Sequence, residues 1–294
     1  MKKSETKKAT QKPDETAGSE VKRKVFANGL PFETEHQAIG EGHLNAIIYG
    51  LLGSGKTTLA AEAEEYEETS PALLVDFEKG TRSIEGSSIE ITRPQSFKEI
   101  QTIYDFLLHD NNKFRSVILD PLTELQRRHS MGEILGDFKI VTGNEEYGYA
   151  DLGISVVATR QDWLKTGEQM RKFIRAFRDL AYLREKERRV HVMMTALEKY
   201  NEKRMLVAPQ LSGALGEECG AMVDLLLRLS KQNVNTAAEG EEEVIVTKRH
   251  LLIDEYTDAE GTKFMAKGRG KDMPRGLWEP TMAEIFRIWK GGKA

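Results

Sequence analysis

The segment GLLGSGKT at residues 50–57 decides the fold of this chain. It fits the pattern G-x-x-x-x-G-K-[ST] at every fixed position. Glycines at positions 50, 53 and 55 let the backbone turn so that its N–H groups point inward around an anion. Lys56 can then reach the β- and γ-phosphates of a triphosphate, and the Thr57 hydroxyl can ligate Mg²⁺. The segment therefore predicts a phosphate-binding loop.

The context of this loop supports the prediction. The apolar run Leu44–Tyr49 precedes it, and a helical stretch begins at Lys56. The positive end of the dipole of this helix would face the same phosphates. A glycine-rich turn without a ligand is the alternative. The residues predicted to bind ATP are Gly50, Gly53, Ser54, Gly55, Lys56, Thr57 and Thr58.

Short apolar runs rich in Val, Ile and Leu alternate with amphipathic stretches. The runs are Leu44–Tyr49, Ala72–Phe77, Ser116–Leu119 and Val190–Ala196, and each resembles a strand that is buried on both faces. Helices are predicted from Lys56, near Ser96, after Pro121 and over residues 168–188. The pattern predicts an α/β fold with a mostly parallel central sheet and helices on both faces.

The two ends of the chain differ from this pattern. Met222–Ser230, Glu243–Ile253 and Thr262–Lys267 follow one another as strands, which predicts an antiparallel extension of the same sheet. Residues 1–24 carry eight Lys or Arg against four Asp or Glu and almost nothing that could be buried. We therefore expect a disordered basic tail over 1–24 and one core domain over 25–294.

Composition excludes several classes of protein. The 294 residues carry a formal net charge of −4, which argues against a globally basic nucleic-acid binder. The single cysteine, Cys219, allows neither an internal disulfide nor a thiolate-rich metal site. No apolar run approaches the ~18 residues of a membrane span. We expect a protein without a membrane partner in a reducing cytoplasm.

Carboxylates follow two of the predicted strands. The run Ser116–Leu119 ends at Asp120, at the strand end where ligands of open α/β sheets collect. We predict that Asp120 and Thr57 hold Mg²⁺, although Asp120 could also cap the helix after Pro121.

Hydrolysis of a triphosphate needs a group that orients or deprotonates water. Glu78, just after the run Ala72–Phe77, is the preferred candidate, and an exposed turn glutamate is the alternative. Thr195 could sense the γ-phosphate from the end of Val190–Ala196, or it could be an ordinary buried β-branched residue.

Seven segments carry a family resemblance by their order and spacing: Gly50–Thr58, Val75–Gly80, Val117–Leu125, Gln161–Trp163, His191–Glu198, Pro209–Gly213 and Ala266–Arg269. Together they resemble the RecA-like P-loop ATPases. Within these, the chain is most similar to a phage nucleotide-binding AAA-domain family, which includes single-strand-annealing recombination ATPases related to the Rad recombinase paralogues. The resemblance covers about residues 44–290 and implies a RecA-like fold.

The resemblance also implies roles for particular residues. Glu78 matches the glutamate that activates water, and Lys267 and Arg269 match basic residues that reach a neighbouring subunit's γ-phosphate. Two loops, about 136–150 and 200–213, match loops that contact single-stranded DNA. The expected DNA-binding residues of the second are Lys199, Tyr200, Lys203 and Arg204.

These expectations favour a Mg²⁺-dependent ATPase that acts on single-stranded DNA in phage recombination or replication. It would work in the bacterial host cytoplasm as a homo-oligomer with shared active sites, with a single-stranded-DNA-binding protein as a further partner. Two alternatives stay open. One is a nucleotide or small-molecule kinase, and the other is a binding module in which ATP gates assembly without hydrolysis.

Overall fold

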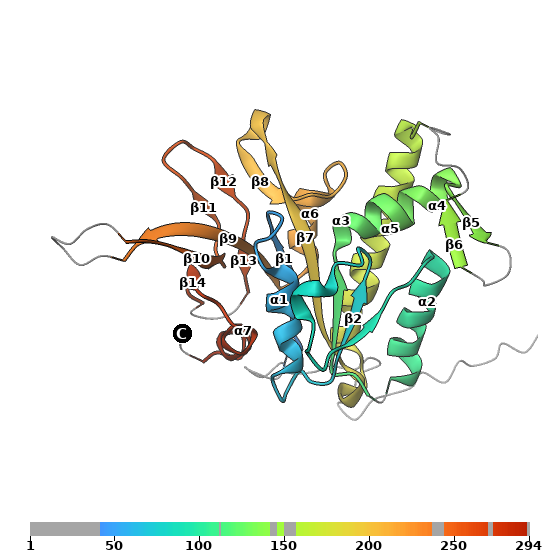
Figure 1. The fold of residues 1–294 in the computed structure, drawn as a ribbon, viewed down its shortest axis with the longest axis horizontal. Helices are drawn as coiled ribbons and strands as arrows, with labels where there is room; N and C mark the ends of the chain where they lie inside the picture. Colours follow the sequence, from blue (N-terminus) through green and yellow to red (C-terminus); the bar gives the residue numbers. More distant parts are fainter. Residues whose placement is uncertain are drawn as a thin grey trace, which may run out of the picture. The chain divides into compact units, whose positions relative to one another are not determined.

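A parallel sheet forms the centre of the structure (Figure 1). The computed structural model describes residues 42–111, 113–141, 146–149, 157–236, 244–269 and 273–292. By contact density the chain divides into Met1–Gln37 and Ala38–Ala294, and all described residues belong to the second unit. The predicted tail at 1–24 lies outside the described residues, and the predicted core boundary at residue 25 stays a prediction.

The parallel strands are arranged in the order β3-β2-β4-β7-β1-β9. The strand that carries the phosphate loop, β1, is therefore separated from β4, which ends at Asp120, by one inserted strand, β7. The bounds are β1 Asn45–Gly50, β2 Ala72–Asp76, β3 Glu90–Thr92, β4 Ser116–Asp120, β7 His191–Asn201 and β9 Leu225–Asn235.

Antiparallel strands extend the sheet beyond β9, as predicted. Ile245–Leu252 (β10) pairs with β9, and Gly276–Trp278 (β14) pairs with β10. Lys267–Gly268 (β13) pairs with the first residues of β9. Three further strands continue from β7. Leu206–Pro209 (β8) is antiparallel to β7, Lys263–Phe264 (β12) is parallel to β8, and Tyr256–Thr257 (β11) is antiparallel to β12.

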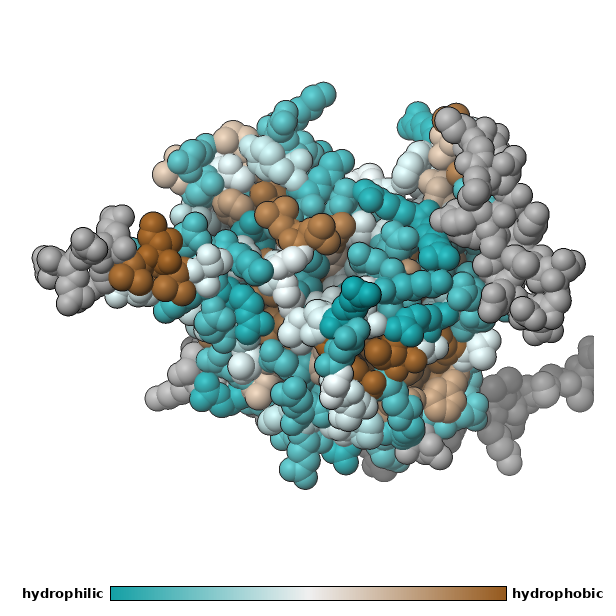
Figure 2. Space-filling view, viewed as in Figure 1, coloured by the Kyte–Doolittle hydropathy of each residue, from teal (hydrophilic) through white to brown (hydrophobic). Residues whose placement is uncertain are grey.

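The β9–β10 pair projects beyond the rest of the sheet (Figure 1). β14 pairs only with residues 250–252 of β10, so residues 245–248 have no described strand on their outer side. Figure 2 shows apolar side chains gathered on this projection, where Val244, Ile245 and Val246 are exposed.

Helices cover both faces of the sheet. Leu59 and Ala60 of α1 (Lys56–Ala61) pack with Phe286 of α7 (Met282–Trp289) on one face. The other face carries α2 (Phe97–Asp105), α3 (Leu122–Glu124), α5 (Arg160–Asp179) and α6 (Leu215–Met222). After α3 the chain continues through a π-helical segment, Leu125–Met131, into α4 (Gly132–Leu135). A separate two-stranded sheet is formed by β5 (Phe138–Val141) and β6 (Glu146–Tyr149).

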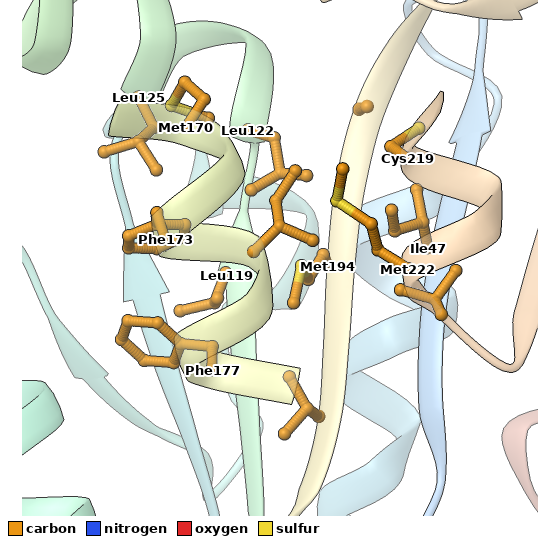
Figure 3. Close-up of a cluster of buried hydrophobic side chains, with 14 of the residues drawn as sticks. Ile47, Leu119, Leu122, Leu125, Met170, Phe173, Phe177, Met194, Cys219 and Met222 are labelled. Atoms are coloured by element: carbon orange, nitrogen blue, oxygen red, sulfur yellow. The ribbon is translucent and has the colours of Figure 1, made fainter. Parts of the chain in front are cut away.

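The larger core lies between the sheet and α5 (Figure 3). Met170, Phe173 and Phe177 project from one side of α5 toward Leu119 and Met194 of the strands. These side chains lie at helical spacing on one side of α5, and their burial packs the helix against β4 and β7.

Several predicted bounds were wrong. The long helix spans Arg160–Asp179, not residues 168–188, because Thr159 and Asp162 form a capping box that starts it earlier. Met222 ends helix α6 and does not start a strand. The predicted strand over 262–267 is split into β12 and β13, which pair with different strands. Within the described residues, no helix is long and apolar enough to cross a membrane.

Candidate functional site

The phosphate loop connects β1 to α1 as predicted. Gly53 and Gly55 adopt φ angles of 71° and 94°, a left-handed conformation that favours glycine. Gly50 has a different reason to be glycine, because a Cβ atom there would lie 2.1 Å from the carbonyl oxygen of Leu229 on β9. The close approach of the two strands therefore allows no side chain at the start of the loop.

The Lys56 ammonium group lies within the curve of the loop. Its Nζ donates to the carbonyl oxygens of Gly50 (3.1 Å) and Leu51 (2.8 Å), and the Ser54 hydroxyl is 3.4 Å away. Burial lowers the pKa of Lys56, while the negative charge of Asp120 opposes that shift. The loop thus holds a lysine at the position from which it can reach an anion.

Asp120 is bound to residues on both sides of it. Thr57 Oγ1 donates to Oδ2 of Asp120 at 2.8 Å, and the hydroxyl of Thr195 donates to Oδ1. Burial raises the pKa of Asp120, although both hydroxyl donors act to lower it. The structure therefore brings together Lys56, Thr57, Asp120 and Thr195, four of the predicted site residues, from three elements.

The donors of this cluster fit Mg²⁺. A hydroxyl and a carboxylate are hard oxygen ligands, and Mg²⁺ is commonly held by one or two protein ligands together with phosphate oxygens and water. Within the described residues there is no group of three or more His, Cys, Asp or Glu that could hold a metal by itself. Thr57 and Asp120 would therefore hold the ion jointly with a bound nucleotide.

Glu78 lies in the turn after β2, and Asp76 shapes that turn. Oδ1 of Asp76 accepts from the backbone N–H groups of Glu78 (3.0 Å) and Lys79 (2.7 Å), while Arg93 binds Oδ2 at 2.9 Å. The pKa of Glu78 is raised by partial burial and by the charge of Asp120. Its carboxylate thus belongs to the same electrostatic cluster as Asp120.

Arg249 lies beside the phosphate loop, a placement that the sequence did not reveal. Its Cδ and Nη1 atoms lie 3.6 Å and 3.9 Å from the place where a Cβ of Gly55 would be. Glu279 fixes it twice, through the Arg249 backbone N–H (2.6 Å) and through Nε (3.2 Å). A cation from β10 therefore borders the phosphate loop, and only the fold brings it there from so far along the chain.

A largely buried ion pair lies on the strands next to the phosphate loop. Arg228 Nε donates to Glu198 Oε2 at 3.0 Å, and their side chains are 15% and 9% exposed. Arg228 also lies over the ring of Phe264 at 4.5 Å. Arg228 on β9 is paired with Tyr49 on β1, the residue just before the phosphate loop. The contacts of Arg228 with Glu198 and Phe264 therefore help to fix the strands next to the loop.

Lys267 and Arg269 lie near the opposite end of the sheet from the phosphate loop. Lys267 pairs with Leu226 near the start of β9, and its Nζ donates to the carbonyl oxygens of Gly220 (2.5 Å) and Val223 (2.7 Å). Arg269 forms a 3.0 Å ion pair with Asp224 and is 52% exposed. Neither reaches the loop of its own chain, and a role at a neighbour's γ-phosphate stays a prediction.

The residues predicted to bind DNA lie on and beside the β7–β8 turn. Lys199 and Tyr200 are exposed on β7, and Lys203 and Arg204 belong to the connecting turn, Glu202–Arg204. Arg204 pairs with Glu217 at 2.6 Å. Within the other predicted DNA loop, residues 142–145 and 150 lie outside the described residues.

Most of the chain matches a family of known proteins. A family model described as AAA domain (AAA_24) matches residues 43–262. The crystal structure of the RadB recombinase matches at a TM-score of 0.39 and 15% identity, over 81% of this chain and 85% of that one. A prototypical ATPase from the type III secretion system of pathogenic bacteria matches at 0.37 and 15%, over 66% of this chain and 56% of that one. No curated protein matches the sequence.

Proposed function

Because this chain belongs to the AAA_24 family of AAA domains, we propose that it binds ATP on residues 50–57 and hydrolyses it with Mg²⁺. One observation carries the proposal. The lysine of the phosphate loop, its threonine and the Asp120 carboxylate meet at one edge of the sheet, with Thr57 and Asp120 2.8 Å apart. This combination places a cation, a hydroxyl and a carboxylate where a triphosphate and its metal need them.

Each residue has a distinct task in this proposal. The inward-facing backbone of the loop and Lys56 bind the phosphates, and Thr57 and Asp120 hold Mg²⁺, which neutralises charge on the phosphate oxygens when bound. Glu78 orients the attacking water and accepts its proton. Thr195 keeps Asp120 in position through its hydroxyl.

Phosphate release from ATP tests the proposal. Wild type should release phosphate with Mg²⁺, whereas Lys56→Ala should lose at least about a hundredfold in rate. Lys98→Ala is the matched control, because Lys98 is exposed on α2, away from the loop. Absence of release by wild type with any nucleoside triphosphate would refute hydrolysis, and phosphate transfer to a nucleoside monophosphate would identify a kinase.

We further propose that the ATPase acts on single-stranded DNA as an oligomer in phage recombination or replication. The support is the exposed set Lys199, Tyr200 and Lys203 at the same sheet edge, and the half-exposed Arg269. DNA-stimulated phosphate release that weakens as salt rises is the expected result. If active sites are shared, a mixture of Lys56→Ala and Arg269→Ala chains should regain hydrolysis that each variant lacks alone. Hydrolysis that survives in Arg269→Ala alone would exclude Arg269 from a role at a neighbour's γ-phosphate.

A further inference from the structure

A pocket of about 390 Å³ opens between the β7–β8 pair, the start of α5 and the π-helical segment after α3. It lies on the same sheet edge as the phosphate loop, because Leu197 is paired with Gly50 and Lys199 lies two residues further along β7 (Figure 1). Its lining includes Gln126, Arg127, Trp163, Lys199, Ser212 and Glu217.

The wall of this pocket holds buried polar groups without partners. Gln126 is 4% exposed, and its Oε1 accepts from the Ser212 backbone N–H at 2.9 Å. That bond fixes which side of the carboxamide is oxygen, so the amino group is left as a donor. Within the described residues, neither Nε2 of Gln126 nor the Ser212 hydroxyl has a hydrogen-bond partner. Buried donors of this kind are completed by a ligand or by ordered water.

The rim of the pocket adds an aromatic face and cations. The Trp163 side chain is 46% exposed, and Arg127 and Lys199 are exposed beside it. The one lining carboxylate, Glu217, is paired with Arg204 at 2.6 Å. A flat group with hydrogen-bond acceptors, attached to negative charge, fits this arrangement.

We propose that the pocket binds a nucleobase of single-stranded DNA. Trp163 stacks on the base, the Gln126 amino group donates to a base oxygen or nitrogen, and Lys199 and Arg127 contact the adjoining phosphates. The inference deepens the proposed function, on which it rests for its partner, by naming a base-binding pocket.

The pocket is also connected to Asp120. Asp120 ends β4, and Gln126 lies six residues later on the helical segment that follows this strand. The backbone N–H of Leu197 donates to Thr123 Oγ1 at 3.0 Å, and Gln210 N–H donates to the Leu197 carbonyl at 2.7 Å. Thr195, two residues before Leu197, binds Asp120. A base in the pocket therefore contacts elements that position the metal-side carboxylate, and it should raise the rate of hydrolysis.

Binding of fluorescein-labelled oligo(dT), followed by anisotropy, and phosphate release with and without unlabelled oligo(dT) test this inference. Trp163→Ala should weaken binding about tenfold and remove the stimulation, and thermal melting checks that the variant is folded. Trp278→Ala is the matched control, because Trp278 is similarly exposed (50%) but lies on β14. Gln126→Met should weaken binding less, since it removes only the donor.

The outcomes separate the two proposals. Trp163-dependent binding of oligo(dT) by a protein that releases no phosphate would support the pocket and overturn the ATPase. Phosphate release together with binding that Trp163→Ala leaves unchanged would overturn the pocket alone. Equal losses in Trp163→Ala and Trp278→Ala would also overturn it, because they would place the DNA elsewhere.

Discussion

Thr195 on β7 donates its hydroxyl hydrogen to Oδ1 of Asp120 on β4, so the inserted strand directly contacts the carboxylate on the metal side of the site. On the other side, Thr57 of the phosphate-loop helix donates to Oδ2. Asp120 is thus held by two hydroxyl groups from the two neighbouring elements.

Asp120→Asn should stabilise the fold while it removes activity. The raised pKa of Asp120 means that its ionised form destabilises the folded state at neutral pH, and this cost is relieved only as pH falls through that pKa. The amide removes the buried charge and should raise the free energy of unfolding by about 0.5–2 kcal/mol. Thermal melts and Mg²⁺-dependent phosphate release measure both effects, and a less stable variant would contradict the electrostatic argument.

Glu78→Gln should lower kcat by about 10²–10⁴ with little change in the KM for ATP, because a glutamine cannot accept the proton of water. Acidification protonates Glu78 and should lower the wild-type rate. Since the pKa of Glu78 is raised, this loss should begin at a higher pH than it would for an ordinary glutamate. Rate profiles from pH 5 to 8 at saturating ATP test this. Glu85→Gln, an exposed glutamate, serves as control and should behave as wild type.

Arg249→Ala should raise the KM for ATP about tenfold and leave kcat nearly unchanged, because a cation beside Gly55 stabilises bound phosphates equally before and during the reaction. Arg249→Lys should restore little, since the side-chain contact from Nε to Glu279 needs a guanidinium group. Steady-state kinetics over a range of ATP concentrations provide the measurement. An unchanged KM in Arg249→Ala would exclude this residue from the nucleotide site.

Acid should unfold the protein through its buried histidines. Burial lowers the pKa of His191 to about 3 and that of His129 to about 4, so both are neutral in the fold. The unfolded chain binds these protons near pH 6.5, and stability should fall as pH drops below that value. We expect a loss of several kcal/mol by pH 3–4, because each tenfold difference in proton affinity corresponds to about 1.4 kcal/mol.

Thermal melts at stepwise lower pH test the histidine prediction. His191 accepts the Leu44 backbone N–H on Nδ1 at 2.8 Å, which requires that nitrogen to be unprotonated. His191→Gln should be less stable at neutral pH but should lose less on acidification. An equally steep pH dependence in the variant would assign the effect to other groups.

The sequence predicted the parts of the site that depend on local pattern. The loop from Gly50 to Thr57, the strand that ends at Asp120 and the helix capped by Ser96 all follow from residues close in the chain. Hydroxyl and carboxylate groups at strand ends could be foreseen because parallel strands of one sheet end at one edge.

The sequence could not predict contacts set by strand order. Nothing local indicates that β7 lies between β1 and β4, and this placement alone brings Thr195 to Asp120. Arg249 reaches Gly55 only because β9 and β10 continue the sheet beside β1. Trp163 could be expected in the core or at an interface, but its place in a pocket depends on where α5 begins, eight residues before the predicted start.

The projecting β9–β10 pair has a consequence for the behaviour of the protein in solution. Residues 245–248 of β10 present backbone groups with no described strand on their outer side, next to the exposed side chains of Val244, Ile245 and Val246. An apolar strand with a free edge recruits further strands. Concentrated samples should therefore self-associate edge to edge, and a lysine in place of Ile245 should keep the chains apart.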